Sequence, residues 1–598
     1  MTPPMDQGAI DPSIADPLNE VKEKVDYWRV RLNRQLLDFN DMANMWRLIR
    51  PKRHGDLSGF ANPQVTETMR ATETIATFFY RALTSANPNF ALLSMNPNVS
   101  QESLWGSEQT INWQMTATGY RRKLMRACRS VALFGTVPVE EPWVVNNPYY
   151  EATDFLPRSL LQVAFDPLCS DMALSSWNCV IDYVTGDQLR IMAKKNPGAW
   201  DLAAVEEAIS SSSSIKSLSP ELLARLTSAG YTTYSGSGST STSSIYELKS
   251  YYGLLKEDDT HGEWCVATIN DIKTIKCYRS PYRRRNFTFG HLTEFELEPF
   301  SYGVGRVALS TQPELNSNRG RMHDVMTFSF FNQWLANRAA NIKSGDLKIK
   351  PWGLIQVDGN PEESLKAMRP QLEALNYGLQ MESMVKGEFR ATVGAPDSLQ
   401  AIVTQATATE SSLAQTEAVR RLSVGAEIFS ESVLREHISK MHENNLTFLD
   451  QPWTIAVTGE PNAVRLFPND LAPEVEVQTK VVTDKDFRPQ RNKDLLQFLQ
   501  VITSIRNQNP QMGQVDLEPF VEEFARGVGM NPKRVWKAVP QMPGLMAPPP
   551  NQAGPGAGPM PNAMDRMAAM QNQVEAMRSN AGEIGAAAHE LAAQGQTQ

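Results

Sequence analysis

The stretch "GAPDSLQAIVTQATATESSLAQTEAVRR", residues 394–421, decides the fold of this chain. It opens with Gly394 and Pro396, which are typical of a loop, and continues in small, mostly uncharged side chains. A helical pattern of about forty residues follows, roughly 60 Å at 1.5 Å per residue. The sequence therefore predicts a loop at 391–406 and a long helix at 407–446.

Small and apolar residues recur on one side of this long helix. They are Ala414, Ala418, Leu422, Ala426, Phe429, Val433 and Leu434. Gly425 falls within the helix, where glycine weakens helical structure and permits a bend. A long helix that is only modestly apolar is expected to pack against neighbouring subunits or other elements.

Two more long helices are predicted before the loop, at 311–343 and 361–390. Between them the stretch "GDLKIKPWGLIQVDGN", residues 345–360, alternates apolar and polar residues, which indicates a compact β-rich connection. Two long helices joined in this way form a stalk.

The remaining segments predict a mixed fold of the α+β class that is mainly helical. Before the stalk, helical patterns cover 21–49, 66–85 and 101–134, and strand-like runs from Thr136 onward indicate a small sheet. After the long helix, "WTIAVTG" and "AVRLF" predict strands, and the stretch 470–508 returns to a helical pattern.

Composition limits the classes of function. With 598 residues the chain exceeds one hydrophobic core, so several domains or one multi-part subunit is expected. It has 58 Lys and Arg against 66 Asp and Glu, a net charge of -8, so any contact with DNA should be local. Five scattered cysteines without a Cys-x-x-Cys pair indicate neither a disulfide framework nor a zinc site, and they fit a reducing cytosol.

Sequence signals of membranes, cofactors and catalysis are not found. The leader at 1–18 lacks the features of a signal peptide, and no run of about 18 apolar residues occurs. The phosphate-binding Gly-x-x-x-x-Gly-Lys-Ser/Thr, the metal-binding His-Glu-x-x-His and the nucleophile turn Gly-x-Ser-x-Gly do not occur. His437 and His442, five residues apart, are expected to be solvated or packed rather than metal-bound. We expect a protein without enzymatic activity, metal or cofactor and without a membrane partner.

Four groups of basic residues could contact phosphate. They are "YRRKLMRACR" at 120–129, "YRRR" at 282–285, "NRGR" at 318–321, and Lys348 with Lys350. For each group, a solvated surface or salt bridges within the chain is the favoured interpretation.

Several stretches in this order resemble the portal, or head-to-tail connector, of short-tailed bacteriophages (podoviruses). The resemblance covers about 19–539 and is carried by "PFSYGVGRVALSTQPELNSNR" at 299–319, "TATESSLAQTEAVRR" at 407–421 and "DLAPEVEVQTKVVTDKDFRPQRNKDLLQFLQ" at 470–500. It implies a ring of typically twelve subunits at one capsid vertex, which forms the channel for genome packaging and ejection.

The resemblance also implies a division of the chain into parts. They are a flexible leader (1–18), a wing (19–310) with Ser-rich loops near 209–244, a first stem helix (311–343), a clip (344–360), a second stem helix (361–390), a tunnel loop (391–406), a tunnel helix (407–446), wing return strands (447–483) and a crown (484–541). The Pro/Gly-rich linker (542–562) and the Ala/Met-rich tail (563–598), which could form a helix, lie beyond the resemblance.

Site residues follow from this division. The tunnel loop would line the channel with Asp397, Ser398, Gln400, Thr404 and Gln405, and we expect Gln400 and Gln405 at the narrowest level. A loop without basic residues contacts a duplex without trapping it. The clip would dock the packaging motor and later the tail adaptor through Lys348, Lys350 and Trp352, and Lys343, Lys348 and Lys350 are candidate contacts to the DNA backbone.

The implied partners are double-stranded DNA bound without sequence specificity, the terminase large subunit, head–tail adaptor and tail proteins, and the major capsid and scaffold proteins. The protein would belong to the portal vertex of the virion and, during assembly, to the host cytoplasm. Two alternatives stay open: a non-conducting oligomeric assembly or scaffold protein, and a DNA-processing enzyme whose site escapes motif reading.

Overall fold

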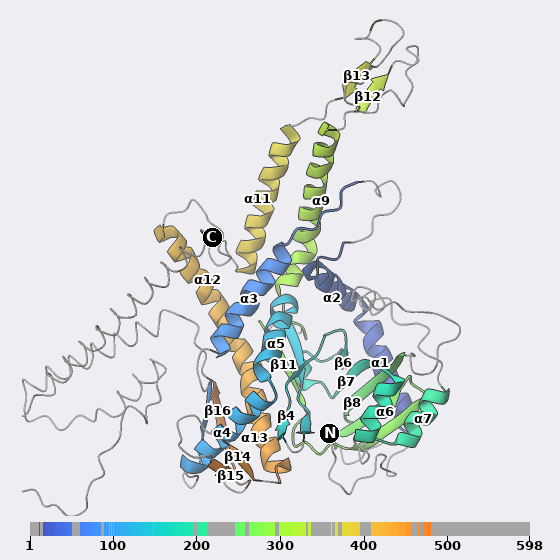
Figure 1. Cartoon of the computed structure of the whole chain (residues 1–598), viewed down its shortest axis with the longest axis vertical. Coiled ribbons are helices and arrows are strands. Elements are labelled where there is room, and N and C mark those ends of the chain that lie inside the picture. Colours follow the sequence, from blue (N-terminus) through green and yellow to red (C-terminus); the bar gives the residue numbers. More distant parts are fainter. Residues whose placement is uncertain are drawn as a thin grey trace, which may run out of the picture. The chain divides into compact units, whose positions relative to one another are not determined.

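All residues that the computed structural model describes belong to one compact unit, Met1–Asn531. The described residues are 11, 16–50, 60–84, 89–146 with gaps at 95, 97–98 and 100, 149–195, 200–211, 245–256, 262–293, 298–330, 333–336, 360, 365–368, 373–394, 408–450, 452–455, 464–466, 468 and 471–479. They form a mixed fold of helices and antiparallel strands (Figure 1).

The first predicted helix is interrupted. Helices α1 (Leu18–Arg31) and α2 (Asn33–Trp46) meet at Leu32, whose backbone has φ -100° and ψ 9°. The apolar positions of the predicted face are nevertheless buried in one cluster, from Val21 in α1 to Met42 in α2. The break redirects α2, so that Phe39 packs edge-on against Phe134 and Phe300.

Two helices also replace the single one predicted at 101–134, while the prediction at 66–85 agrees with α3 (Glu67–Thr84). Helices α4 (Gln101–Ala117) and α5 (Tyr120–Phe134) are separated by Gly119, which has φ 66°. Only glycine adopts this left-handed conformation without steric cost, so the helix ends there.

The predicted sheet has five antiparallel strands, in the order β10-β9-β8-β7-β6. Their bounds are β6 (Val163–Phe165), β7 (Trp177–Thr185), β8 (Ile245–Gly253), β9 (Trp264–Ile269) and β10 (Lys273–Arg279). Adjacent residues of a strand point to opposite faces. On β9, Val266 belongs to the core that includes α1, and Ala267 belongs to the core with α6 (Gly186–Lys195) and α7 (Leu202–Ser211), two helices that the sequence did not predict.

Smaller sheets complete the strand structure. Strand β2 (Thr136–Glu140) lies between β11 (Phe287–His291) and β5 (Leu156–Pro157). Three two-stranded pairs are β3 (Trp143–Asn146) with β4 (Tyr150–Thr153), β14 (Trp453–Ile455) with β15 (Val464–Leu466), and β1 (Phe90–Leu93) with β16 (Glu476–Thr479). The predicted strands at "WTIAVTG" and "AVRLF" are thus confirmed as β14 and β15. The helical interpretation of 470–508 is wrong at β16, where pairing with β1 supplies the backbone hydrogen bonds.

The predicted ends of the two stalk helices need correction. Helix α9 (Val304–Phe330) begins before 311 and contains Pro313, and α11 (Glu373–Val393) begins after 361 (Figure 1). Residues assigned to helix instead form β12 (Gln333–Ala336) and β13 (Leu365–Met368), which pair with each other. The second predicted helix would contain Pro370, which lacks an N–H and clashes with the preceding turn, and α11 begins three residues after it.

The long helix after the loop is confirmed and has one irregular turn. The chain is helical through α12 (Ala408–Phe429), a π-helical segment (Ser430–Arg435) and α13 (Glu436–Phe448). The irregularity lies at the π-helical segment, and Gly425 sits inside regular α12. A Cβ at Gly425 would lie 2.9 Å from Leu292 Cδ1, so this glycine permits close packing.

The π-helical segment packs against a second glycine. A Cβ at Gly290 of β11 would lie 2.3 Å from Val433 Cγ2. We therefore expect Gly290→Ala to reduce the free energy of unfolding by about 1–3 kcal/mol through overpacking. Gly387→Ala in α11, where an added Cβ would have no atom within 4 Å outside the backbone of its own helix, should instead raise it by about 0.5–1 kcal/mol. Urea unfolding measures both, and equal effects would contradict the packing described.

Candidate functional site

The predicted channel and clip residues lie outside the described residues. This holds for the whole channel set, Asp397, Ser398, Gln400, Thr404 and Gln405, and for Lys343, Lys348, Lys350 and Trp352. The same is true of the Ser-rich stretch 212–244 and of the predicted crown, linker and tail. The structure does describe where the loop begins and ends, at the end of α11 and the start of α12.

The origin of the loop has a left-handed turn. Gly394 follows α11 with φ 72°, and its N–H donates to the carbonyl of Ala391 at 3.4 Å. A glycine in this conformation is the usual way in which a helix ends. The predicted break at Gly394 is therefore confirmed, and its position depends on how α11 is held.

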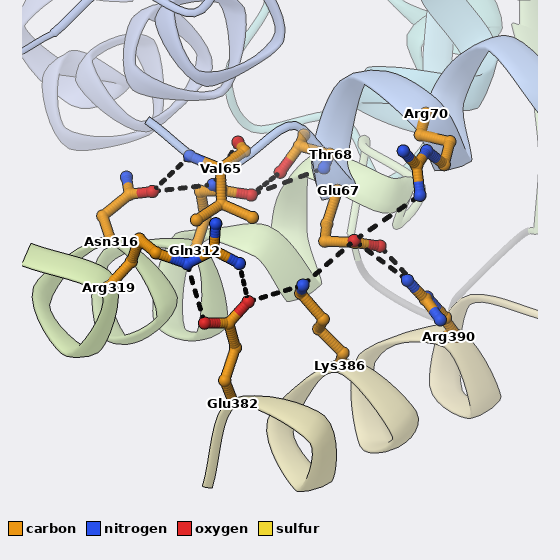
Figure 2. A network of polar contacts seen from close by, with 10 residues as sticks. All are labelled: Val65, Glu67, Thr68, Arg70, Gln312, Asn316, Arg319, Glu382, Lys386 and Arg390. Atoms are coloured by element: carbon orange, nitrogen blue, oxygen red, sulfur yellow. Dashed lines mark hydrogen bonds and ion pairs between the residues drawn. The ribbon is translucent and has the colours of Figure 1, made fainter. Parts of the chain in front are cut away.

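A buried carboxylate holds this end of α11. Glu67, the first residue of α3, is 3% exposed and accepts two hydrogen bonds from Arg390, at 3.0 and 2.9 Å (Figure 2). Such a bidentate pair is strong and fixes orientation as well as distance. Because Arg390 lies one turn before Gly394, the pair fixes α3 to the helical turn from which the loop departs.

A second buried carboxylate connects α11 to α9. Glu382 accepts from Arg319 Nε at 2.8 Å and from Lys386 Nζ at 2.6 Å. Lys386 Nζ also lies 3.9 Å from Glu67, so it stands between the two carboxylates (Figure 2). The hydrogen bond from Arg319 lowers the pKa of Glu382 to about 2, with Lys386 adding to the effect and burial opposing it. The carboxylate is therefore ionised at neutral pH.

Amide side chains of α9 fix the segment that leads into α3. Gln312, which is buried, donates to the carbonyl of Val65 at 2.7 Å and accepts from Thr68 Oγ1 at 2.7 Å. Asn316 accepts from the N–H of Val65 at 2.8 Å. Val65, Leu315 and Val385 form a small apolar cluster beside these bonds. We call the ten residues of Figure 2 the junction, because they join α3, α9 and α11.

Helices α9 and α11 also approach each other closely beyond the junction. Asn318 Nδ2 donates to the carbonyl of Gly378 at 2.8 Å. A Cβ at Gly378 would lie 2.8 Å from the Sδ of Met322. The glycine therefore allows the two helices to pack at short range.

Another face of α11 exposes large apolar side chains. Tyr377, Met381 and Met384, spaced by four and three residues on one helical face, are 71%, 43% and 55% exposed. We call these three the α11 stripe. Val385 and Phe389, on the neighbouring face that packs within the chain, are buried. A helix that is apolar all round is normally covered all round, so the stripe is an interface candidate. The stripe was not predicted from the sequence, although "LNYGLQMESMV" has this all-round apolar pattern.

Another buried polar centre fixes the long helix to the sheet. Glu141, fully buried after β2, contacts His437 Nδ1 at 2.7 Å and Lys440 Nζ at 3.0 Å. It also accepts from Thr288 Oγ1 at 2.6 Å. Burial alone would raise the pKa of Glu141, but Lys440, His437 and Thr288 outweigh it and lower this pKa to about 2. The centre is buried, so its role is to fix α13 to β2 and β11.

The pKa of Glu141 predicts an acid-sensitive contribution to stability. Because it is lowered from 4.5 to about 2 on folding, the stabilisation is present above pH 4.5 and is lost as the pH falls toward 2. The difference in free energy of unfolding between wild type and Glu141→Gln should therefore shrink by roughly 3 kcal/mol between pH 6 and pH 2. Urea unfolding at several pH values measures it, and a constant difference would contradict the assignment.

The two histidines of α13 are packed. His437 stacks on Tyr120 with ring centroids 5.4 Å apart, and His442 Nε2 lies 2.8 Å from the carbonyl of Ala472. Among the described residues, no group of three or more His, Cys, Asp or Glu side chains could hold a metal ion. Nor does any described helix carry an apolar run long enough to cross a bilayer.

The basic groups divide into paired and exposed members. Those in ion pairs are Lys123, Arg129, Arg284, Arg285 and Arg319. The salt bridges favoured by the sequence analysis are confirmed for these five. The exposed members in the described part of the chain are Arg121, Arg122, Arg126, Arg283 and Arg321.

Comparison with known proteins gave no assignment. No protein-family model matches the chain, and no curated protein matches it. The function is therefore inferred from the sequence and from the geometry of the junction, the loop ends and the α11 stripe.

Proposed function

We propose that this chain is the subunit of a bacteriophage portal of the short-tailed type. About twelve copies would form a ring at one capsid vertex, through which DNA is packaged and later ejected. The chain would act as a channel and docking platform, with no catalytic activity or cofactor of its own. In this proposal α9 and α11 are the stem, α12 to α13 is the tunnel helix, and the β12–β13 pair begins the clip.

The α11 stripe is the observation that carries the proposal. Helix α11 already packs against α9 within the chain, so its exposed apolar face is available to another molecule. Large exposed apolar patches mark association surfaces, whose cores are enriched in Tyr and Met. In a cyclic ring each subunit contacts the next through two different surfaces, and every stripe becomes covered.

The junction also supports the portal proposal, because it fixes the end of α11 from which the loop departs. A loop that faces a passing duplex needs a rigid origin, because functional loops depend on the scaffold that positions them. Glu67 holds α11 one turn before Gly394, and Glu382 joins α11 to α9 about two turns earlier. Residues 394–407 contain no Lys or Arg, so the loop would contact DNA without the counterion release that makes binding tight.

The clip would bind two partners, one after the other. We propose that Lys348, Lys350 and Trp352 dock the terminase large subunit during packaging and the tail adaptor afterwards. The double charge reversal Lys348→Glu/Lys350→Glu should weaken pull-down of these partners at least tenfold while rings still form. Undiminished pull-down would contradict this docking role.

The mass of the purified assembly tests the proposed function. A ring of about twelve 66.7 kDa chains has a mass near 800 kDa, which native mass spectrometry resolves from neighbouring subunit numbers. We expect a single closed species in this range, formed by the chain alone or after addition of scaffold protein. Open chains or dimers under both conditions would count against a ring.

A further inference from the structure

Four exposed arginines lie on two adjacent helices, away from the junction and the α11 stripe. Arg81 belongs to the last turn of α3, and Arg121, Arg122 and Arg126 belong to the first two turns of α5. Their guanidinium groups have no carboxylate partner among the described residues. Two neighbouring basic residues of α5 have carboxylate partners: Lys123 pairs with Asp154, and Arg129 pairs with Glu73.

Helices α3 and α5 pack side by side and run antiparallel, which places the last turn of α3 at the same end as the first turns of α5 (Figure 1). We call the four arginines at this end the patch. Thr68 near the start of α3 hydrogen-bonds to Gln312 of α9. Leu133 near the end of α5 lies against Gly303, directly before α9. The start of α3 and the end of α5 therefore both lie beside the first three turns of α9.

An ion pair sets the alignment of the two helices. Glu73 of α3 holds Arg129 of α5 with hydrogen bonds of 2.6 and 2.9 Å. Arg81 lies two turns after Glu73, and Arg121 lies two turns before Arg129, so both are at one level. Arg122 and Arg126 precede Arg129 at intervals of seven and three residues, on the same face of α5.

The position of the patch is unfavourable for the isolated chain. The first turn of α5 contains Arg121, Arg122 and Lys123, and no acidic residue. The amino-terminal end of a helix carries partial positive charge and favours anions, so cations there repel it and one another. The preceding Gly119 provides no side-chain cap. A bound anion would relieve all of these effects together.

We propose that this Arg81–Arg121–Arg122–Arg126 patch binds the phosphate backbone of nucleic acid without sequence specificity. Guanidinium groups bind phosphate through paired hydrogen bonds. Interfaces with DNA are more polar and more positive than those with proteins, whose cores need apolar residues. In α5 and in the last two turns of α3, no large apolar side chain is exposed, which favours nucleic acid over an acidic protein segment.

The patch is distinct from the proposed channel, and the probe should separate the two. A covalently closed DNA minicircle cannot thread through a closed ring, so its binding reports only on outer surfaces. The full-length protein is titrated into labelled minicircle at about 50 to 200 mM salt, the range over which phosphate contacts weaken strongly. A polyglutamate peptide serves as the acidic-protein probe.

We expect the quadruple Arg→Ala variant to bind the minicircle at least tenfold more weakly than wild type. The slope of log affinity against log salt should fall by roughly 0.9 for each phosphate that is no longer neutralised, or about 3 to 4 in total. The quadruple Arg→Lys variant keeps the charges and should retain most of the binding. Arg283→Ala/Arg321→Ala, which removes two exposed arginines elsewhere, should match wild type. Thermal unfolding should show no variant destabilised, and the quadruple Arg→Ala variant should be somewhat more stable because the repulsion at the start of α5 is removed.

Three results would overturn the proposal. The first is an affinity of wild type for the minicircle too weak to measure at the lowest salt. The second is equal binding by wild type and the quadruple Arg→Ala variant, which would assign DNA binding to another surface. The third is loss of polyglutamate binding alone, which would assign the patch to an acidic protein partner. None of these results depends on whether the protein forms a ring with a channel.

Discussion

The Glu67→Gln variant is expected to lose about 3–5 kcal/mol of its free energy of unfolding. The substitution keeps the shape of the side chain and removes its charge, so Arg390 and Lys386 lose the carboxylate that they share. Their side chains are only 14% and 22% exposed, so water compensates poorly. Because α3 is then no longer fixed to the end of α11, the loop after Gly394 also loses its fixed origin.

Arg70→Ala is the matched control for this prediction. Arg70 lies 3.9 Å from the same carboxylate, but its side chain is 46% exposed. Exposed pairs contribute little, so a loss below about 1 kcal/mol is expected. Urea unfolding measures both variants, and adding Arg390→Ala and the double variant Glu67→Gln/Arg390→Ala completes a double-mutant cycle for Glu67 and Arg390. Similar losses for Glu67→Gln and Arg70→Ala would show that the buried pair does not organise the junction.

The Tyr377→Glu/Met384→Glu variant is expected to abolish the ring while the subunit stays folded. Both side chains are exposed in the subunit, so its own stability should change little. In the ring each carboxylate would be buried without a partner at every subunit contact, and this unfavourable free energy repeats around the ring. Sedimentation velocity should show subunits or small oligomers in place of the closed assembly.

Leu168→Glu/Leu174→Glu is the control for the stripe variant. These leucines are also exposed, at 78% and 75%, but they belong to a loop and a short 3-10 turn instead of α11. Rings should persist in this variant. If both double variants assemble equally well, the stripe is not the subunit interface, and the observation that carries the portal proposal is lost.

The sequence predicted the long helix best. Its apolar positions recur regularly, and Leu422, Ala426 and Phe429 are buried in the main core as expected. Such a periodic pattern is a property of a short stretch of sequence, so it predicts a helix without knowledge of the rest of the fold. The ends of α9 and α11 were misplaced because β12 and β13 are defined by pairing with each other, across residues far apart in the sequence.

The junction could not be predicted for the same reason. Glu67 and Arg390 are 323 residues apart, and neither belongs to a motif. A buried carboxylate in a first helical turn has the same sequence signature as a solvated one. The basic groups could not be divided from the sequence for the same reason. Arg126 and Arg129 belong to one stretch, and only the fold shows that Glu73 pairs with Arg129.

Electron microscopy of the purified protein, with class averages viewed along the particle axis, tests the portal proposal most directly. We expect a closed ring of about twelve subunits around a hole wide enough for a DNA duplex, with α9 and α11 of each subunit packed against those of the next. A closed assembly without a central channel would contradict the proposal and would favour a non-conducting assembly or scaffold protein.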